Sequence, residues 1–151
     1  MKIVKRLLIF LLCIVMAGGI LFLISIPGVN DHIAKQTMTE LAQVPMPEQT
    51  KCIEKVSAAG KLSGNGNGMQ YLGAFLVKSD LSLKNLKKYY TENTPEEWYC
   101  DVERQKGQSL CVSEHVDLRF KHPVKGKKDY YVVYAWGDYD GIYSELDLRG
   151  H

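Results

Sequence analysis

Apolar residues are concentrated near the N-terminus, where an almost unbroken hydrophobic run covers residues 7–26. The basic residues Lys2, Lys5 and Arg6 precede this run. A helix rises about 1.5 Å per residue, so a run of this length spans the roughly 30 Å hydrocarbon core of a bilayer. Basic residues beside such a helix remain in the cytoplasm. The pattern therefore predicts a cytoplasmic tail at residues 1–6, a transmembrane anchor formed by the run, and a remainder outside the cytoplasm.

A cleaved signal peptide is the alternative to an anchor. Its apolar core is usually about 7 to 15 residues long and ends at a cleavage site with small residues. Ala17-Gly18-Gly19 would provide such a site, but cleavage would leave the apolar segment 20–24 at the new N-terminus. The sequence therefore favours an uncleaved, single-pass protein of the cell membrane, and a secreted protein if the segment is removed.

The residues after the apolar run have weaker patterns. Pro27-Gly28 is predicted to end the membrane helix, because proline breaks the hydrogen bonding of a helix interior. Residues 27–48 have only loose helical periodicity and are predicted to form a juxtamembrane stalk. Residues 49–151 are enough for one domain with a single core.

Alternating or continuous apolar positions predict several strands in this domain. The segments 69–78 and 130–136 are apolar on both faces, which indicates central strands. The first strand segment also fits a helix, and the fourth is either one kinked strand or two short ones. The predicted strands cover residues 49–62, 69–78, 98–103, 110–120, 130–136 and 142–148.

One helix is clearly indicated after Ser82. The Ser82 side chain can cap the first turn, and Leu81 can pack against Leu86 as a hydrophobic staple. The short connections between the later segments favour antiparallel neighbours. The predicted fold class is therefore α+β: an antiparallel β-sheet with one main helix packed on a face, preceded by an N-terminal transmembrane helix.

Net charge gives no support for binding to nucleic acid. The chain has 19 Lys and Arg residues against 17 Asp and Glu residues. Three of the basic residues precede the apolar run, so the predicted domain is almost neutral. A nucleic-acid partner is therefore not expected.

Cysteine placement leaves two alternatives open. Cys52, Cys100 and Cys111 would lie outside the cytoplasm, where disulfides form. If the chain makes a hairpin near Lys106-Gly107, Cys100 and Cys111 come nearly opposite one another, and a cross-strand disulfide between them is predicted. Three free thiols are the alternative. None of the spacings favours a zinc site.

Catalytic and metal signatures are weak. Asp138 and Asp140 followed by glycine resemble the start of a calcium loop, but Glu145 comes too early for its bidentate ligand. His115 and His151, like His122, would need a carboxylate or thiol within hydrogen-bond reach to act in catalysis. No catalytic residue, metal site or cofactor is predicted.

Aromatic residues are the better indication of a binding surface. The chain has nine Tyr and two Trp residues, and exposed Tyr and Trp side chains often anchor partners. A tyrosine-rich core is the alternative, and solvent exposure distinguishes the two. The candidate binding residues are Tyr71, Tyr99, Tyr131, Tyr139 and Tyr143.

Three strings carry a resemblance to other proteins. They are Gly60-Lys-Leu-Ser-Gly-Asn-Gly-Asn-Gly-Met-Gln-Tyr71, Lys78-Ser-Asp-Leu-Ser-Leu83 and Leu146-Asp-Leu-Arg-Gly-His151. In these strings the sequence resembles a group of small bacterial exported or membrane-anchored proteins of uncharacterised function. The resemblance implies one exported domain and assigns no activity or catalytic residue.

The expected function is non-catalytic. A domain without a catalytic motif on a membrane anchor is expected to bind a protein, peptide or envelope component, for example as an immunity-type inhibitor of a toxin. A small cell-envelope hydrolase that uses Asp138, Asp140 or a histidine is the alternative. A cleft that joins His115 or His151 to a carboxylate would favour the hydrolase.

Overall fold

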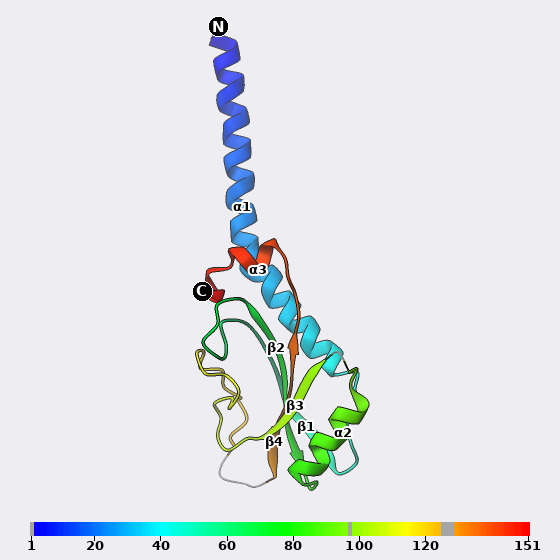
Figure 1. Cartoon of the computed structure of the whole chain (residues 1–151). Coiled ribbons are helices and arrows are strands. Elements are labelled where there is room, and N and C mark those ends of the chain that lie inside the picture. Colours follow the sequence, from blue (N-terminus) through cyan, green and yellow to red (C-terminus); the bar gives the residue numbers. More distant parts are fainter. Residues whose placement is uncertain (1, 97, 125–128) are drawn as a thin grey trace.

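The fold was determined as a computed structural model that describes residues 2–96, 98–124 and 129–151. Met1 of the predicted cytoplasmic tail lies outside these residues. A long helix, α1 (Lys2–Leu41), projects from a domain built on a four-stranded antiparallel sheet (Figure 1). The predicted α+β class, with its helix-covered antiparallel sheet after a long apolar helix, is confirmed.

The sheet has the strand order β1-β2-β4-β3. The central strands β2 (Gln70–Ser79) and β4 (Tyr130–Gly137) are almost entirely buried, as their apolar pattern predicted. Strands β1 (Thr50–Gly60) and β3 (Tyr99–Arg104) form the two edges. The ambiguous first segment is therefore a strand.

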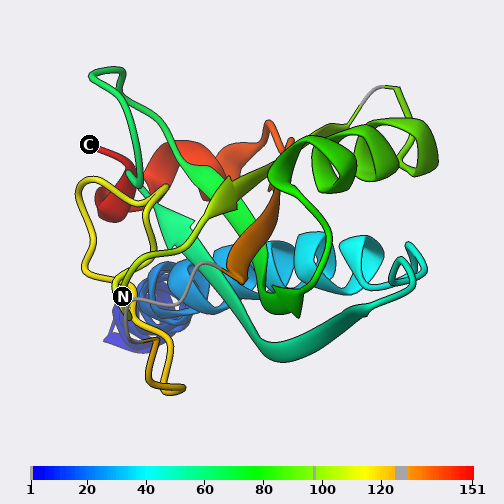
Figure 2. The ribbon, with the colours of Figure 1, turned by 90° about the horizontal axis from the view of Figure 1, so that it is seen from below.

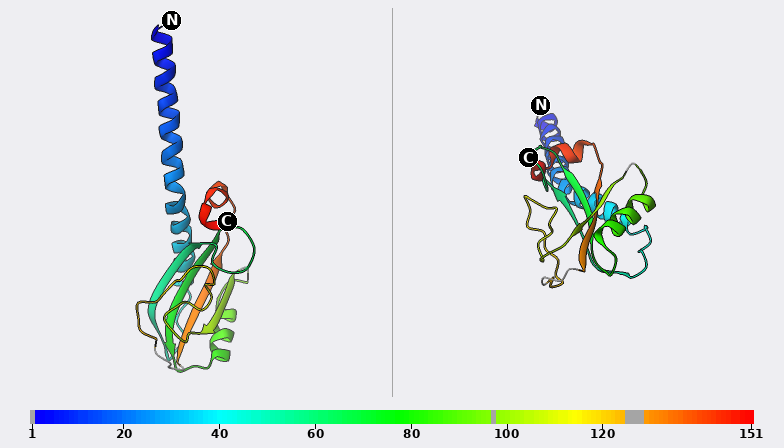
Figure 3. Two further views of the ribbon diagram at one scale, coloured as in Figure 1. Left: turned by 90° about the vertical axis from the view of Figure 1, so that its left-hand side faces the viewer. Right: turned by 60° about the horizontal axis from the view of Figure 1, so that its bottom comes forward.

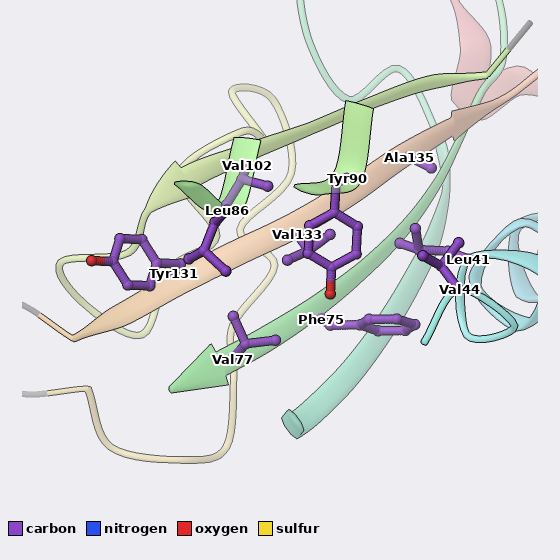
Figure 4. Packing of buried hydrophobic residues seen from close by; sticks show 10 residues of the cluster. All are labelled: Leu41, Val44, Phe75, Val77, Leu86, Tyr90, Val102, Tyr131, Val133 and Ala135. Atoms are coloured by element: carbon purple, nitrogen blue, oxygen red, sulfur yellow. The ribbon is translucent and has the colours of Figure 1, made fainter. Parts of the chain in front are cut away.

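One face of the sheet is covered by two helices. The predicted second helix is α2 (Leu83–Asn93), and Ser82 caps it, because the Ser82 hydroxyl accepts a hydrogen bond from the Asn85 backbone N–H at 3.2 Å. The second half of α1 lies beside α2 on this face. Figure 4 shows the resulting core, in which Leu41 of α1 and Tyr90 of α2 lie close to Phe75 of β2.

The opposite face is covered by a loop rather than by helices (Figure 2). Leu110 and Phe120 of this loop pack against β2 and β4. The predicted strand or strands at residues 110–120 do not form; Ser109 and Arg119 make an isolated bridge instead. The buried Gln105 side-chain amide holds the loop by donating to the carbonyl oxygens of Gly107 and Ser109. The apolar pattern thus identified core residues but not their backbone conformation.

The predicted helix end at Pro27-Gly28 is wrong. Helix α1 continues through Pro27 to Leu41, and the segment predicted as a stalk packs onto the sheet. Proline removes one helix hydrogen bond, but here an apolar run precedes it and a docked segment follows it, so the helix is stabilised on both sides. Figure 1 shows that α1 changes direction near the level of α3 (Ile142–Leu146), as proline-containing helices commonly do.

Two glycines allow α1 to lie flat on the sheet. A Cβ atom at Gly73 of β2 would come within 2.5 Å of the Met38 backbone nitrogen and Cα. A Cβ atom at Gly137 of β4 would overlap the Thr37 side chain. The close approach of helix and sheet therefore depends on glycine at both positions.

The final predicted strand, 142–148, is also wrong. This segment forms the short helix α3 and the 3-10 turn η1 (Leu148–Gly150). The Ser144 hydroxyl donates to the Gly141 carbonyl oxygen at 2.6 Å and accepts from the Gly141 N–H at 3.2 Å, which closes the first turn of α3. Ile142 and Leu146 are four residues apart, which fits one helical turn. An alternating pattern this short does not distinguish a strand from such a turn.

Candidate functional site

A buried polar network joins α1 to the C-terminal segment. The Asn30 side-chain amide donates to Asp147 Oδ2 at 2.7 Å and to the Tyr143 carbonyl oxygen at 2.9 Å. Its oxygen accepts a hydrogen bond from the Tyr71 hydroxyl at 2.8 Å. Asn30, Tyr71 and Asp147 are all buried, so these hydrogen bonds fix α3 and η1 against α1 and β2.

Arg149 adds charge to this network. Its guanidinium donates to Asp147 Oδ2 at 2.8 Å, to Asp31 Oδ1 at 2.7 Å and to the Pro27 carbonyl oxygen at 3.1 Å. The hydrogen bonds from Arg149 lower the pKa of Asp147 to about 2, and the Asn30 amide contributes in the same direction. The pKa of Arg149 is raised by the same pairing. Asp147 is thus a buried, ionised and fully paired carboxylate.

Two of the strings that carry the resemblance meet in space at this network. The Lys61 backbone N–H donates to the Arg149 carbonyl oxygen at 2.7 Å, and the Gly68 N–H donates to the Gly150 carbonyl oxygen at 2.7 Å. Gly150 is also packed closely, because a Cβ atom there would lie 2.9 Å from the Met69 nitrogen. The loop after β1 and the C-terminal segment therefore form one structural unit.

A groove runs along the outer edge of β1 next to this unit. It has a volume of about 450 Å³. Val116 and Leu118 line the groove, and so do Asp31 and Arg149, which form an ion pair with each other. The strand segment 57–60 contributes small side chains to it. This is an apolar groove beside an edge strand.

A second groove of about 480 Å³ lies between the loop after β1 and α3. Its lining includes Asp138, Asp140 and His151, so it joins a histidine to carboxylates, as the hydrolase alternative requires. Ser144 also lines it, but its hydroxyl is engaged with Gly141. The His151 ring nitrogen contacts the Glu145 carbonyl oxygen at 3.2 Å rather than a carboxylate or hydroxyl.

A third groove, of about 290 Å³, lies where the end of α1 meets the ends of β3 and β4. Trp98 and Trp136 line it together with Glu40 and Asp138. Indole rings and carboxylates favour contact with a cationic or aromatic group. Neither tryptophan was among the predicted site residues, although both had been counted in the aromatic composition.

The five candidate tyrosines do not form a common surface. Tyr71 and Tyr131 are buried in the core, Tyr139 and Tyr143 are half-buried, and Tyr99 is exposed. The Tyr139 ring packs edge-on against the Tyr71 ring, with centroids 5.9 Å apart. The solvent-exposure test therefore favours the tyrosine-rich core over an aromatic binding face.

The predicted disulfide is not formed in this structure, where Cys100 and Cys111 are free. Cys100 packs against the helix-covered core, whereas the Cys111 thiol contacts Glu103 Oε2 at 3.7 Å. Burial raises the pKa of Cys100 to about 12. The pKa of Cys111, which lies at the surface, is also raised, by partial loss of hydration and by the neighbouring Glu103 carboxylate. At neutral pH both are thiols rather than nucleophilic thiolates.

The histidines have structural contacts. The His115 ring contacts the Gly64 carbonyl oxygen at 2.6 Å, and the His122 ring contacts the Tyr130 hydroxyl at 3.1 Å. Within residues 2–96, 98–124 and 129–151, no cluster of three or more His, Cys, Asp or Glu side chains could hold a metal ion. The arrangement supplies surfaces for binding more clearly than groups for catalysis.

The polar network was missed at the sequence level. Asn30 and Thr37 lie on the buried side of α1, where an apolar residue is expected, and they interrupt its hydrophobic periodicity. The spacing Asp147-x-Arg149 was the available signal, because an acidic and a basic residue two apart can pair in a turn. No family model, curated protein or solved structure matches the chain.

Proposed function

We propose that the protein is a single-pass membrane module whose domain lies outside the cytoplasm and binds an extended segment of a protein or peptide partner along the edge of β1. Binding, rather than catalysis, is its function. An immunity-type inhibitor that captures a segment of a toxin is one concrete form of this proposal.

The membrane part of the proposal rests on the first half of α1. This helix is long and apolar enough to cross a membrane, and its most apolar window has a mean hydropathy of 3.1 with none of its residues buried. Lys2, Lys5 and Arg6 precede that window, which favours a cytoplasmic N-terminus and an external domain.

The binding part rests on one observation: the groove lies along an edge strand. An edge strand has unpaired backbone groups on its outer side, and an extended peptide can hydrogen-bond to them. In β1 the bulge lies near Cys52 and Glu54, so the segment 57–60 beside the groove is regular. Val116 and Leu118 would contact alternate side chains of the added strand.

The other edge is a poorer candidate. Strand β3 has 6 residues, compared with 11 in β1. A short edge strand offers few backbone hydrogen bonds to a partner.

Site-specific photocrosslinking tests the proposal in native membranes. A photoreactive amino acid at Val116, which is exposed, is compared with one at Lys84, an exposed position on α2. We expect the full-length protein to crosslink one partner from position 116 and not from position 84, and mass spectrometry would identify the crosslinked peptide. Equal crosslinking from both positions, or none from position 116, would contradict strand addition at β1.

The small cell-envelope hydrolase remains a second proposal because the second groove joins His151 to Asp138 and Asp140. The hydrogen bonds of Ser144 and His151 do not form a nucleophile and base pair. Assays of the full-length protein on peptidoglycan and on ester substrates would decide. Hydrolysis that is lost in Asp138→Asn and His151→Ala would favour this function over the binding module.

A further inference from the structure

The C-terminal segment exposes an unusual share of apolar side chains. Outside α1, the large hydrophobic residues that are exposed in the described parts of the chain are Tyr99, Val116, Ile142, Leu146 and Leu148. Three of these lie in α3 and η1. Their exposed fractions are 56% for Ile142, 43% for Leu146 and 87% for Leu148. Water is therefore an unfavourable environment for this surface.

This apolar surface lies beside the end of the hydrophobic run. The Phe22 ring on α1 packs against the Tyr143 ring on α3, with centroids 5.5 Å apart. Phe22 belongs to the last turns of the run that ends at Ile26. Figure 3 shows α3 at the end of the domain from which the first half of α1 projects. When that half crosses a bilayer, α3 lies at the bilayer boundary.

The position of α3 is fixed by the polar network. Asn30 holds the Tyr143 carbonyl and Asp147, and Arg149 holds Asp31 and the Pro27 carbonyl. These contacts join both ends of the segment to α1, so the segment and the membrane helix form one rigid body. The apolar residues of α3 cannot be withdrawn from the boundary without breaking buried hydrogen bonds.

We propose that Ile142, Leu146 and Leu148 insert into the interfacial region of the same bilayer that α1 spans. The occupant of this surface is lipid, because the packing of Tyr143 against Phe22 places the surface beside the end of the apolar run, where a spanning helix leaves the bilayer. The proposal rests on the membrane-spanning part of the proposed function and is independent of the partner at β1.

The contact is hydrophobic rather than electrostatic. Arg149 of η1 is paired with Asp31 and Asp147, and Glu145 of α3 is exposed, so this surface offers no excess of positive charge to acidic headgroups. Tyr143 and Phe22 have the amphipathic or aromatic character that favours the headgroup level. The segment is accordingly expected to insert into zwitterionic membranes, and high salt is not expected to release it.

Quenching by brominated lipids tests the insertion. The full-length protein is reconstituted into phosphatidylcholine vesicles that have bromine atoms on the acyl chains near the glycerol. Tryptophan is placed at Leu148, which is almost fully exposed, and the fluorescence is compared with that of the unsubstituted chain. We expect the fluorescence added by Leu148→Trp to be lost in the brominated vesicles and retained in unbrominated ones.

Two matched variants make each outcome decisive. Lys84→Trp, on α2, should give fluorescence that the bromines do not quench, whereas Leu12→Trp should be quenched by bromines near the bilayer centre. Quenching of Leu12→Trp without quenching of Leu148→Trp would leave the anchor intact and overturn the interfacial contact, as would chemical crosslinks at position 148 to a second protein. Failure of both variants to be quenched would overturn the spanning helix and this proposal together.

Discussion

The two halves of α1 are parts of one helix with opposite surroundings. Every described residue from Lys2 to Leu21 is exposed in the first half. In the second half one side is buried, at positions three or four residues apart, and this side includes polar residues. The buried positions are Ile26, Asn30, Ala34, Thr37 and Leu41.

This difference separates a half that is long and apolar enough to cross a membrane from a half that docks on a sheet. A helix in lipid needs apolar side chains all round, because no neighbour shields its surface. A helix docked on a sheet needs only one side that is complementary to the sheet. Small or polar residues can form that side if the sheet provides space and hydrogen-bond partners. Gly73 provides the space for Met38, and Tyr71 provides a partner for Asn30.

The largest expected effect comes from removing a docking residue. Leu41→Ala should lower the free energy of unfolding of the domain by roughly 2–5 kcal/mol, because Leu41 is fully buried and the truncation leaves a cavity. Leu12→Ala, in the first half, should leave the domain unchanged. Chemical unfolding of the full-length protein in detergent micelles, followed by tryptophan fluorescence, measures both. If both substitutions lowered the free energy of unfolding equally, the docked and undocked halves of α1 would not differ as described.

A slightly smaller effect is expected from filling the space that admits α1. Gly73→Ala places a methyl group against the Met38 backbone, which cannot move aside as a side chain could. We expect a loss of about 3 kcal/mol in the free energy of unfolding, the upper part of the range for overpacking. Gly107→Ala is the matched control, because no atom lies within 4 Å of its added Cβ. A Gly73→Ala protein as stable as the control would show that α1 does not lie flat on the sheet.

The smallest effect is a pH dependence from the network that holds α1. The folded pKa of Asp147 is about 2, below its ordinary value of 3.8, so ionised Asp147 stabilises the folded state above about pH 4. This stabilisation, about 2 kcal/mol, is lost as the pH falls from about 4 to about 2. We expect the difference in unfolding free energy between the natural chain and Asp147→Asn to shrink over that interval. A difference that stays constant would show that Asp147 is not held ionised.

The sequence was sufficient where a single pattern determined the structure. The run 7–26, the apolar strands at β2 and β4, and the helix capped by Ser82 follow from local hydrophobicity and capping. The sequence was insufficient where contacts with distant parts of the chain determine the structure. The helix continues through Pro27 because the residues after it dock on a sheet whose strands come later in the sequence.

The candidate site was predicted less well than the fold for the same reason. Tyr71 and Tyr131 were chosen as candidate surface residues, but neighbouring elements bury them. The groove beside β1 depends on which strand is an edge, and strand order requires contacts between distant segments. Local spacing can indicate the pair of Asp147 and Arg149, but it cannot reveal that Asn30, more than a hundred positions away in the chain, joins them.

Continuity of α1 through Pro27 is the central claim, and a distance between spin labels tests it most directly. Labels on unnatural amino acids at Ile14 and Lys35, both exposed, leave the four cysteines in place. At about 1.5 Å per residue, one continuous helix predicts a narrow distribution centred near 30 Å in lipid vesicles. A broad distribution, or one with a much shorter mean, would show that the helix breaks at Pro27 and that the domain moves independently of its anchor.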